Sequence, residues 1–382
     1  MRGLNLQIGY FVAHMAGTTK NPNMTRRFGP GLLMGIAASL LKPWLWLLRK
    51  NPTTVQKSLT VFQSYLVGDL FMALPALKVL ADSHEIAVLC RPDCVQLLKD
   101  EGLHGIPFDN EFFIRPDFPS FVRTLRSAWK LRGEIGTWAL DFDADPRTAF
   151  WLKIAGATRV VSYSRPFAFL FDNSFPIPDE AIHQADKNRA VASEFLARYE
   201  TTFALKNPPP ENSPSPASHP KSDGTWIISC WTRKDTKNWP LDRWNEFLKR
   251  MQEARIPFRI LNSPDGDAAF QEFQAHWIGR APFLEGSLHD VADAVQASTG
   301  IVATDNFIGH MAGYYDKPVL WINGSSDPLQ VSPKGPKTRI VQMDPMNCRP
   351  CNHRCVNPEY KACLFHLEMN EVWQAFEELR RV

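Results

Sequence analysis

The sequence predicts an α/β protein made of two doubly wound domains that face each other across a central cleft. From about residue 58 onward, short β-prone runs alternate with helix-like segments, the pattern of a parallel sheet covered by helices on both faces. A proline-rich stretch interrupts this alternation once, and the alternation then restarts. The length of 382 residues also suits two domains with some additional chain, at roughly 150 residues per domain.

The first domain is predicted at residues 58–203. Its strand candidates are the β-prone runs at residues 59–62, 86–89 and 138–142. Residues 70–81 are apolar at helical spacing and predict a helix after the first strand. Pro75 falls inside this helix, and we expect it to lie near the helix start, where a proline is tolerated.

A linker is predicted at residues 204–224, because this stretch is rich in proline and poor in apolar residues. The second domain follows at residues 225–382. Its predicted elements are strands at residues 226–230, 258–261, 300–304 and 318–322 and an amphipathic helix at residues 241–252. In doubly wound sheets, ligands bind outside the carboxyl ends of the strands, so we expect the site there.

The N-terminal extension, residues 1–57, is basic and partly apolar. No acidic residue precedes Asp69, and residues 31–48 are apolar apart from Lys42-Pro43, which divides them into runs too short to span a bilayer. Trp44, Trp46 and the flanking arginines predict a helix lying on an anionic membrane surface. Two alternatives remain, a helix packed on the first domain and an upstream extension from a wrongly assigned start codon.

The bulk charge excludes one class of partner. The formal net charge is only +3, which is not that of a polycation built to bind nucleic acid.

The start of the chain lacks the apolar core and small-residue cleavage site of a signal peptide. We therefore expect a cytoplasmic protein, peripheral on the inner face of the inner membrane.

Three segments carry candidate site residues, and each lies where a strand meets a helix. Asp69 follows the first strand and either caps the helix or acts as a general base. The run from Trp231 to Pro240 offers hydroxyls, backbone N–H groups and Lys237 to a diphosphate, or is a solvated polar loop.

In the third segment, residues 304–310, Asp305 is suited to accept hydrogen bonds from sugar hydroxyls. The backbone N–H groups of the following helix start are suited to phosphate oxygens. His310 taken alone is more typical of a satisfied interior histidine than of a ligand contact.

In this order, the segments resemble glycosyltransferase family 9, the heptosyltransferases. The resemblance rests on residues 67–77 with Gly68-Asp69 and Pro75, residues 141–156 with Arg147, residues 232–244 with Lys237, and residues 305–328 with Asp305 and Asp327-Pro328. It covers roughly residues 58–382. Each motif is weak alone, but four motifs in order are specific.

The resemblance implies a GT-B fold, with two Rossmann-like domains, the first on the acceptor side and the second binding the nucleotide sugar. It implies metal-independent, inverting transfer of a heptose from ADP-heptose to a lipopolysaccharide core or lipid acceptor, with no cofactor. Asp69 would be the catalytic base. The implied donor-binding residues are Thr232, Lys237, Asp305, Asn306, Phe307 and His310.

One departure from the family pattern favours two alternatives. Asn306-Phe307 stands where the family usually has Thr-Gly. The bulky phenylalanine side chain leaves less room for a phosphate to come close to the backbone. A transferase for a different nucleotide sugar, or an inactive nucleotide-sugar-binding protein, is therefore also compatible with the sequence.

Four cysteines cluster near the C-terminus, at Cys348, Cys351, Cys355 and Cys363. Four thiols in so short a stretch are suited to a structural zinc ion, although their spacing is not that of two separated Cys-x2-Cys pairs. Disulfides and free thiols packed in a loop are the alternatives, and a zinc-dependent interaction module is the rival function.

Overall fold

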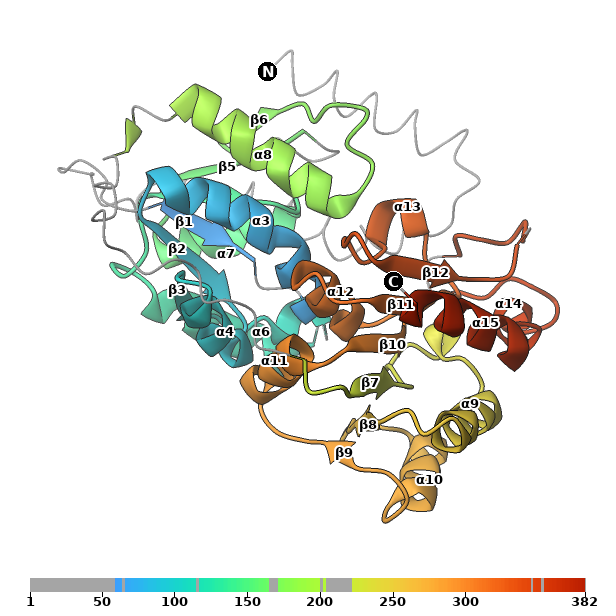
Figure 1. Cartoon of the computed structure of the whole chain (residues 1–382). Coiled ribbons are helices and arrows are strands. Elements are labelled where there is room, and N and C mark those ends of the chain that lie inside the picture. Colours follow the sequence, from blue (N-terminus) through green and yellow to red (C-terminus); the bar gives the residue numbers. More distant parts are fainter. Residues whose placement is uncertain are drawn as a thin grey trace.

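The computed structural model describes residues 59–63, 66–114, 117–164, 171–199, 202–203, 222–344, 346–351 and 354–381. They form two six-stranded sheets in which every strand pairing is parallel. Helices lie on both faces of each sheet (Figure 1). The predicted pair of doubly wound α/β domains is therefore confirmed.

The first sheet is built from residues of the predicted first domain. Its strands are β1 (Leu59–Phe62), β2 (Ile86–Cys90), β3 (His104–Pro107), β4 (Trp138–Asp141), β5 (Arg159–Tyr163) and β6 (Asn173–Phe175). Its helices are α3 (Val67–Ser83), η1 (Pro92–Cys94), α4 (Val95–Asp100), α5 (Glu111–Ile114), α6 (Phe118–Lys130), α7 (Pro146–Ala155) and α8 (Gln184–Tyr199). The central strands β1, β2 and β4 are buried along their whole length, as expected for a sheet covered on both faces.

The second sheet belongs to the predicted second domain. Its strands are β7 (Trp226–Ser229), β8 (Phe258–Leu261), β9 (Phe283–Leu284), β10 (Gly300–Thr304), β11 (Val319–Ile322) and β12 (Thr338–Val341). Its helices are η4 (Asp235–Lys237), α9 (Leu241–Glu253), α10 (Ala268–Trp277), α11 (Leu288–Ala297), α12 (Phe307–Tyr314), α13 (Pro328–Val331), α14 (Ala362–Phe365) and α15 (Met369–Arg380).

Both sheets have the same strand order relative to their own first strand. The first runs β3-β2-β1-β4-β5-β6, and the second runs β9-β8-β7-β10-β11-β12 when read in the same sense. The connections therefore reverse direction between β1 and β4 and again between β7 and β10. The carboxyl ends of strands at such a reversal are where ligands bind in open α/β sheets.

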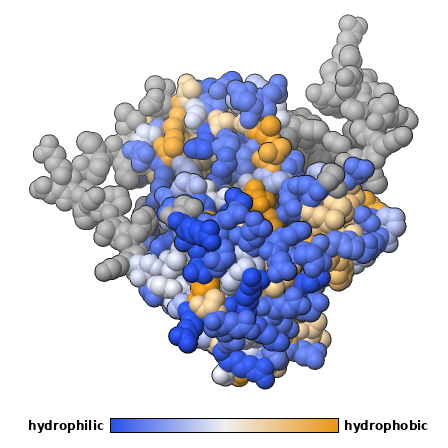
Figure 2. Space-filling view, turned by 45° about the vertical axis from the view of Figure 1, so that its right-hand side comes forward, coloured by the Kyte–Doolittle hydropathy of each residue, from blue (hydrophilic) through white to orange (hydrophobic). Residues whose placement is uncertain are grey.

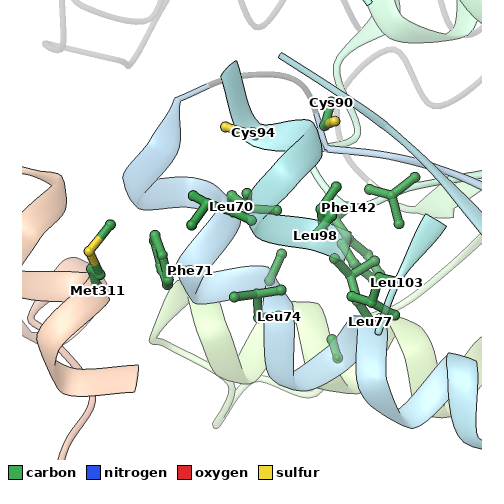
Figure 3. Packing of buried hydrophobic residues seen from close by; sticks show 14 of the residues in the cluster. Leu70, Phe71, Leu74, Leu77, Cys90, Cys94, Leu98, Leu103, Phe142 and Met311 are labelled. Atoms are coloured by element: carbon green, nitrogen blue, oxygen red, sulfur yellow. The ribbon is translucent and has the colours of Figure 1, made fainter. Parts of the chain in front are cut away.

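The two domains are packed directly against each other through α3 and α12. Phe71 of α3 and Met311 of α12 belong to one buried cluster that contains residues of both domains, and their side chains face each other (Figure 3). At the edge of this contact, Glu101 accepts hydrogen bonds from the hydroxyl groups of Tyr314, at 2.6 Å, and Tyr315, at 3.3 Å. The packing fixes the helix starts of the two domains relative to each other.

The helix predicted at residues 70–81 is longer than expected. It begins at Val67, so Pro75 lies in the helix interior rather than near its start, and this expectation was wrong. The earlier start is stabilised by Asp69, whose carboxylate accepts the N–H of Leu66. Buried residues on several sides of α3 stabilise it by tertiary packing, which offsets the cost of about 3 kcal/mol for an interior proline.

Two predicted segments fall outside the described residues. These are the whole N-terminal extension, residues 1–57, and most of the predicted linker, residues 204–221. Among the described helices, none has the length and apolar character needed to cross a bilayer. On the face shown in Figure 2, hydrophobic residues form separate patches within a mostly hydrophilic surface.

Candidate functional site

Asp69 lies in the first turn of α3, the helix that follows β1 in the chain. Its Oδ2 atom accepts a hydrogen bond of 3.2 Å from the N–H of Leu66, as in a capping box. The structure therefore places Asp69 in a helix-capping position, one of its two predicted roles. Capping occupies one side of the carboxylate, and a carboxylate has further lone pairs with which it can act as a base.

Gly68 brings this helix start against the second domain. A Cβ atom on Gly68 would lie 3.0 Å from Cδ2 of His310 and 3.6 Å from Cα of Phe307. Only a residue without a side chain fits this approach without displacing its neighbours. The chain next to Asp69 is thus in contact with the start of α12, where the donor site is predicted.

Lys237 and Asp305 form an ion pair at the carboxyl ends of β7 and β10. Nζ of Lys237 lies 2.9 Å from Oδ2 of Asp305, and both side chains are largely buried. The sequence placed these two residues in different motifs, and the structure joins them. Ser326, which sequence reasoning did not single out, also donates a hydrogen bond from its hydroxyl to Oδ2 of Asp305.

The start of α12 is organised by Asn306. Its side-chain oxygen accepts the N–H of Ile308, and its amide nitrogen donates to the hydroxyl of Ser229 at 2.7 Å. Asn306 therefore links the end of β7 to the end of β10 as well as capping the helix. Phe307 is the first residue of α12, so the backbone predicted to meet phosphate is a helix N-terminus, which favours anions.

His310 is buried one turn into α12. Burial lowers the pKa of its imidazole to about 4, and the carboxylate of Asp305 opposes this shift without reversing it. The ring is therefore neutral near pH 7. Its Nδ1 atom has no hydrogen-bond partner among the described residues. His310 is thus an interior histidine, but the expectation that it would be satisfied is not met in the described part of the chain.

Thr232 and Lys237 belong to one ordered loop between β7 and α9. The side chain of Asn238 bridges the loop, accepting the N–H of Thr232 and donating to its carbonyl, each at 2.8 Å. Residues Asp235–Lys237 form the short helix η4, which presents Lys237 toward Asp305. Residues 233–235 are exposed and residues 236, 238 and 239 are buried, so the segment is only in part a solvated polar loop. Binding of a diphosphate by this segment stays a prediction.

The cysteine-rich segment packs behind η4. Asp235 accepts hydrogen bonds from Nζ of Lys361, at 2.7 Å, and from the hydroxyl of Tyr360, at 2.8 Å. The N–H of Lys361 in turn lies 3.2 Å from Sγ of Cys355. Contacts over this sequence distance leave no local pattern, so sequence reasoning missed them. They connect the C-terminal segment to the loop that carries Lys237.

The four clustered thiols form no disulfide, and neither do the other three cysteines. Within the described residues, no group of three or more His, Cys, Asp or Glu side chains is placed to hold a metal ion. His353, the neighbouring histidine, lies outside those residues. Zinc binding by Cys348, Cys351, Cys355 and Cys363 stays a prediction, which metal analysis of the purified protein tests.

A buried acidic group lies at the reversal point of the first sheet. Asp141 ends β4, and its carboxylate accepts the backbone N–H groups of Asp143 and Asp145, each at 3.2 Å. Burial, together with the negative charges of Asp143 and Asp145, raises the pKa of Asp141 well above its usual range. Arg147, at the start of α7, pairs with Asp145 at 2.6 Å. Asp145 and Arg147 thus partly neutralise each other within this turn.

Comparisons of the fold give consistent neighbours. The E. coli ADP-heptose lipopolysaccharide heptosyltransferase II superposes with a TM-score of 0.62 at 18% identity, covering 85% of this chain and 98% of that one. The E. coli heptosyltransferase WaaC with ADP-2-deoxy-2-fluoro heptose gives 0.63 at 16% identity, covering 84% and 99%. A family 9 glycosyltransferase from Veillonella parvula gives 0.64 at 13%, covering 85% and 97%. These likenesses confirm the GT-B fold.

The sequence comparisons identify the family. Curated protein sequences give no match to this chain. The model of glycosyltransferase family 9 (heptosyltransferase) matches residues 125–361, which is more than half of the chain and includes Lys237, Asp305 and His310. The chain therefore belongs to glycosyltransferase family 9, the heptosyltransferase family.

Proposed function

We propose that this protein transfers a heptose from ADP-heptose to a lipopolysaccharide core or lipid acceptor, with inversion at the anomeric carbon and without an essential metal. The observation that carries the proposal is the contact between Gly68 and His310. It brings the start of α3, with Asp69, against the start of α12, beside the ion pair of Lys237 and Asp305. A base and a leaving-group site are then adjacent.

On this proposal, Asp69 is the general base. It takes the proton from the acceptor hydroxyl as that oxygen attacks the anomeric carbon and the bond to the ADP phosphate breaks. A positioned base contributes roughly 10²–10⁴-fold to such a reaction. The Leu66 N–H bond orients the carboxylate by holding Oδ2, and a carboxylate can accept several bonds, including one from an acceptor hydroxyl.

The leaving diphosphate is stabilised by Lys237 and by the N-terminus of α12. Donor binding lets Lys237 exchange part of its interaction with Asp305 for the phosphate oxygens, and Asp305 is then available to accept sugar hydroxyls. A well-placed donor that meets charge developing in the transition state is worth about 3–4 kcal/mol. The neutral His310 ring adds a hydrogen-bonding group without a competing charge.

The test is a donor screen with the purified full-length protein. A panel of nucleotide sugars is incubated with a Kdo-lipid acceptor, and products are detected by mass. We expect a product heavier by one heptose with ADP-heptose, and a changed anomeric configuration by NMR. If transfer occurs only from another nucleotide sugar, that sugar replaces ADP-heptose as the proposed donor. Tight donor binding with neither transfer nor hydrolysis for any sugar would favour an inactive binding protein.

A further inference from the structure

Helix α6 exposes large apolar side chains on its outer side. Phe118, its first residue, is 77% exposed, and Trp129, near its end, is 55% exposed. They are separated by about three turns of 3.6 residues, so they lie on the same side of the helix. The opposite side packs inward through the buried residues Ser120, Thr124 and Ala128.

The same outer side is basic. Residues 118–133 contain four arginine or lysine residues and no aspartate or glutamate. Arg123 is paired with Glu111 at 2.6 Å, and Arg132 stacks on the ring of Trp129 at 4.7 Å. Arg126 is exposed between the two aromatic residues in the chain, and Lys130 is exposed directly after Trp129. Aromatic rings next to exposed cations suit the headgroup region of an anionic bilayer.

The position of α6 in the fold is consistent with this partner. The helix follows α5 after the carboxyl end of β3 and leads back to the start of β4, so Phe118 lies on the side of the sheet where the strands end. That side also carries Asp69, after β1. A bilayer lying along the outer side of α6 would therefore have one end of its contact, at Phe118, on the side of the sheet that carries Asp69.

We propose that the outer side of α6, formed by Phe118, Arg126, Trp129 and Lys130, docks on an anionic lipid bilayer. The inference deepens the proposed function, because a lipid-linked acceptor stays in the membrane. Vesicle binding is measured without donor or acceptor, so failure of docking is distinguishable from failure of heptose transfer. The surface belongs to the first domain and not to the sequence of residues 1–57, which carry the other predicted membrane contact.

The test is flotation of the full-length protein with vesicles of phosphatidylcholine alone or mixed with phosphatidylglycerol. We expect binding to the mixed vesicles that weakens as salt is raised. The R126Q/K130Q variant should lower the partition coefficient about fivefold for each basic residue removed. The F118S/W129S variant should lower it at least as far. Residues 1–57 are present in every protein, so their contribution is constant.

The matched control is I278S/K249Q, which removes an exposed apolar residue and an exposed lysine from the second domain. It should bind as the wild type does. Wild-type binding by both α6 variants would overturn the proposal, as would equal binding to vesicles without anionic lipid. If F118S/W129S instead abolishes a concentration-dependent dimer and leaves vesicle binding unchanged, α6 is a self-association surface. R126Q/K130Q changes only exposed side chains and keeps the test valid should F118S/W129S misfold.

Discussion

Nζ of Lys237 lies 2.9 Å from Oδ2 of Asp305, and the carboxylate is almost fully buried. The two residues come from different loops, after β7 and after β10, so the pair connects the two strands between which the second sheet reverses direction. A buried carboxylate is costly unless a cation and hydrogen bonds compensate it. The pair therefore has a structural role in the protein without ligand, alongside the role proposed for Lys237 in catalysis.

The two roles of Lys237 are separable by mutation. Lys237→Met should lower the free energy of unfolding by about 3 kcal/mol, because it leaves the carboxylate of Asp305 buried and unpaired. It should also lower kcat/KM for the nucleotide sugar by roughly 10²–10³-fold. Urea unfolding and initial rates measure the two effects.

The double variant Lys237→Met/Asp305→Asn is the control for that experiment. Removing both charges should restore most of the free energy of unfolding, because no unpaired charge remains. It should restore none of the activity. Recovery of activity together with stability would mean that Lys237 acts only by neutralising Asp305.

Asp69 is tested against a residue with the same structural role elsewhere. Asp69 is the third residue of α3, and Asp290 is the third residue of α11. Each carboxylate accepts the N–H of the residue that immediately precedes its helix. Asp69→Asn should reduce kcat by roughly 10²–10⁴-fold with donor affinity unchanged by calorimetry, because only the base is lost. Asp290→Asn should keep wild-type turnover. Equal small losses in both variants would reduce Asp69 to a helix cap.

The buried strands were predictable from sequence because a strand covered on both faces is a continuous apolar run. Gly300–Thr304 is an example, and its predicted bounds match the structure. The edge strand β6, Asn173–Phe175, was missed because two of its three residues are exposed. β9, Phe283–Leu284, is only two residues long and gives no periodic signal.

The candidate site was predictable only as far as it is local. Asp69, Lys237 and Asp305 each follow a strand, so strand-to-helix turns indicated them. The pairing of Lys237 with Asp305 and the hydrogen bond from Tyr360 to Asp235 join distant parts of the chain. Such contacts depend on how the strands are ordered in the sheet, which local periodicity does not encode.

The contact between η4 and the C-terminal segment predicts a positioning role for Lys361. Lys361 holds Asp235 at 2.7 Å, and Asp235 begins the short helix that ends at Lys237. Lys361→Met should therefore raise KM for the nucleotide sugar about tenfold and change kcat less, because small displacements of a binding group are costly. Asp235→Asn should do the same, and the two effects should not add in the double variant.

Arg259→Met is the matched control for Lys361→Met. It breaks another short ion pair of the second domain, between Arg259 of β8 and Asp223 at 2.5 Å, which does not touch η4. Its KM should equal that of the wild type. A rise in KM of the same size in Arg259→Met would point to general loosening of the domain rather than to positioning of Lys237.

Burial of His310 predicts a pH dependence of stability. The pKa of the imidazole is about 4 in the folded protein, below its ordinary value of about 6.5, so the unfolded chain binds more protons between these values. The free energy of unfolding should then fall as pH decreases from about 6.5 toward 4. Between pH 7 and pH 5 this single group should lower the free energy of unfolding by about 2 kcal/mol.

His310→Gln should lose that part of the pH dependence, and urea unfolding of both proteins at the two pH values measures the difference. Parallel losses of stability in wild type and variant would show that the His310 pKa is not lowered by burial.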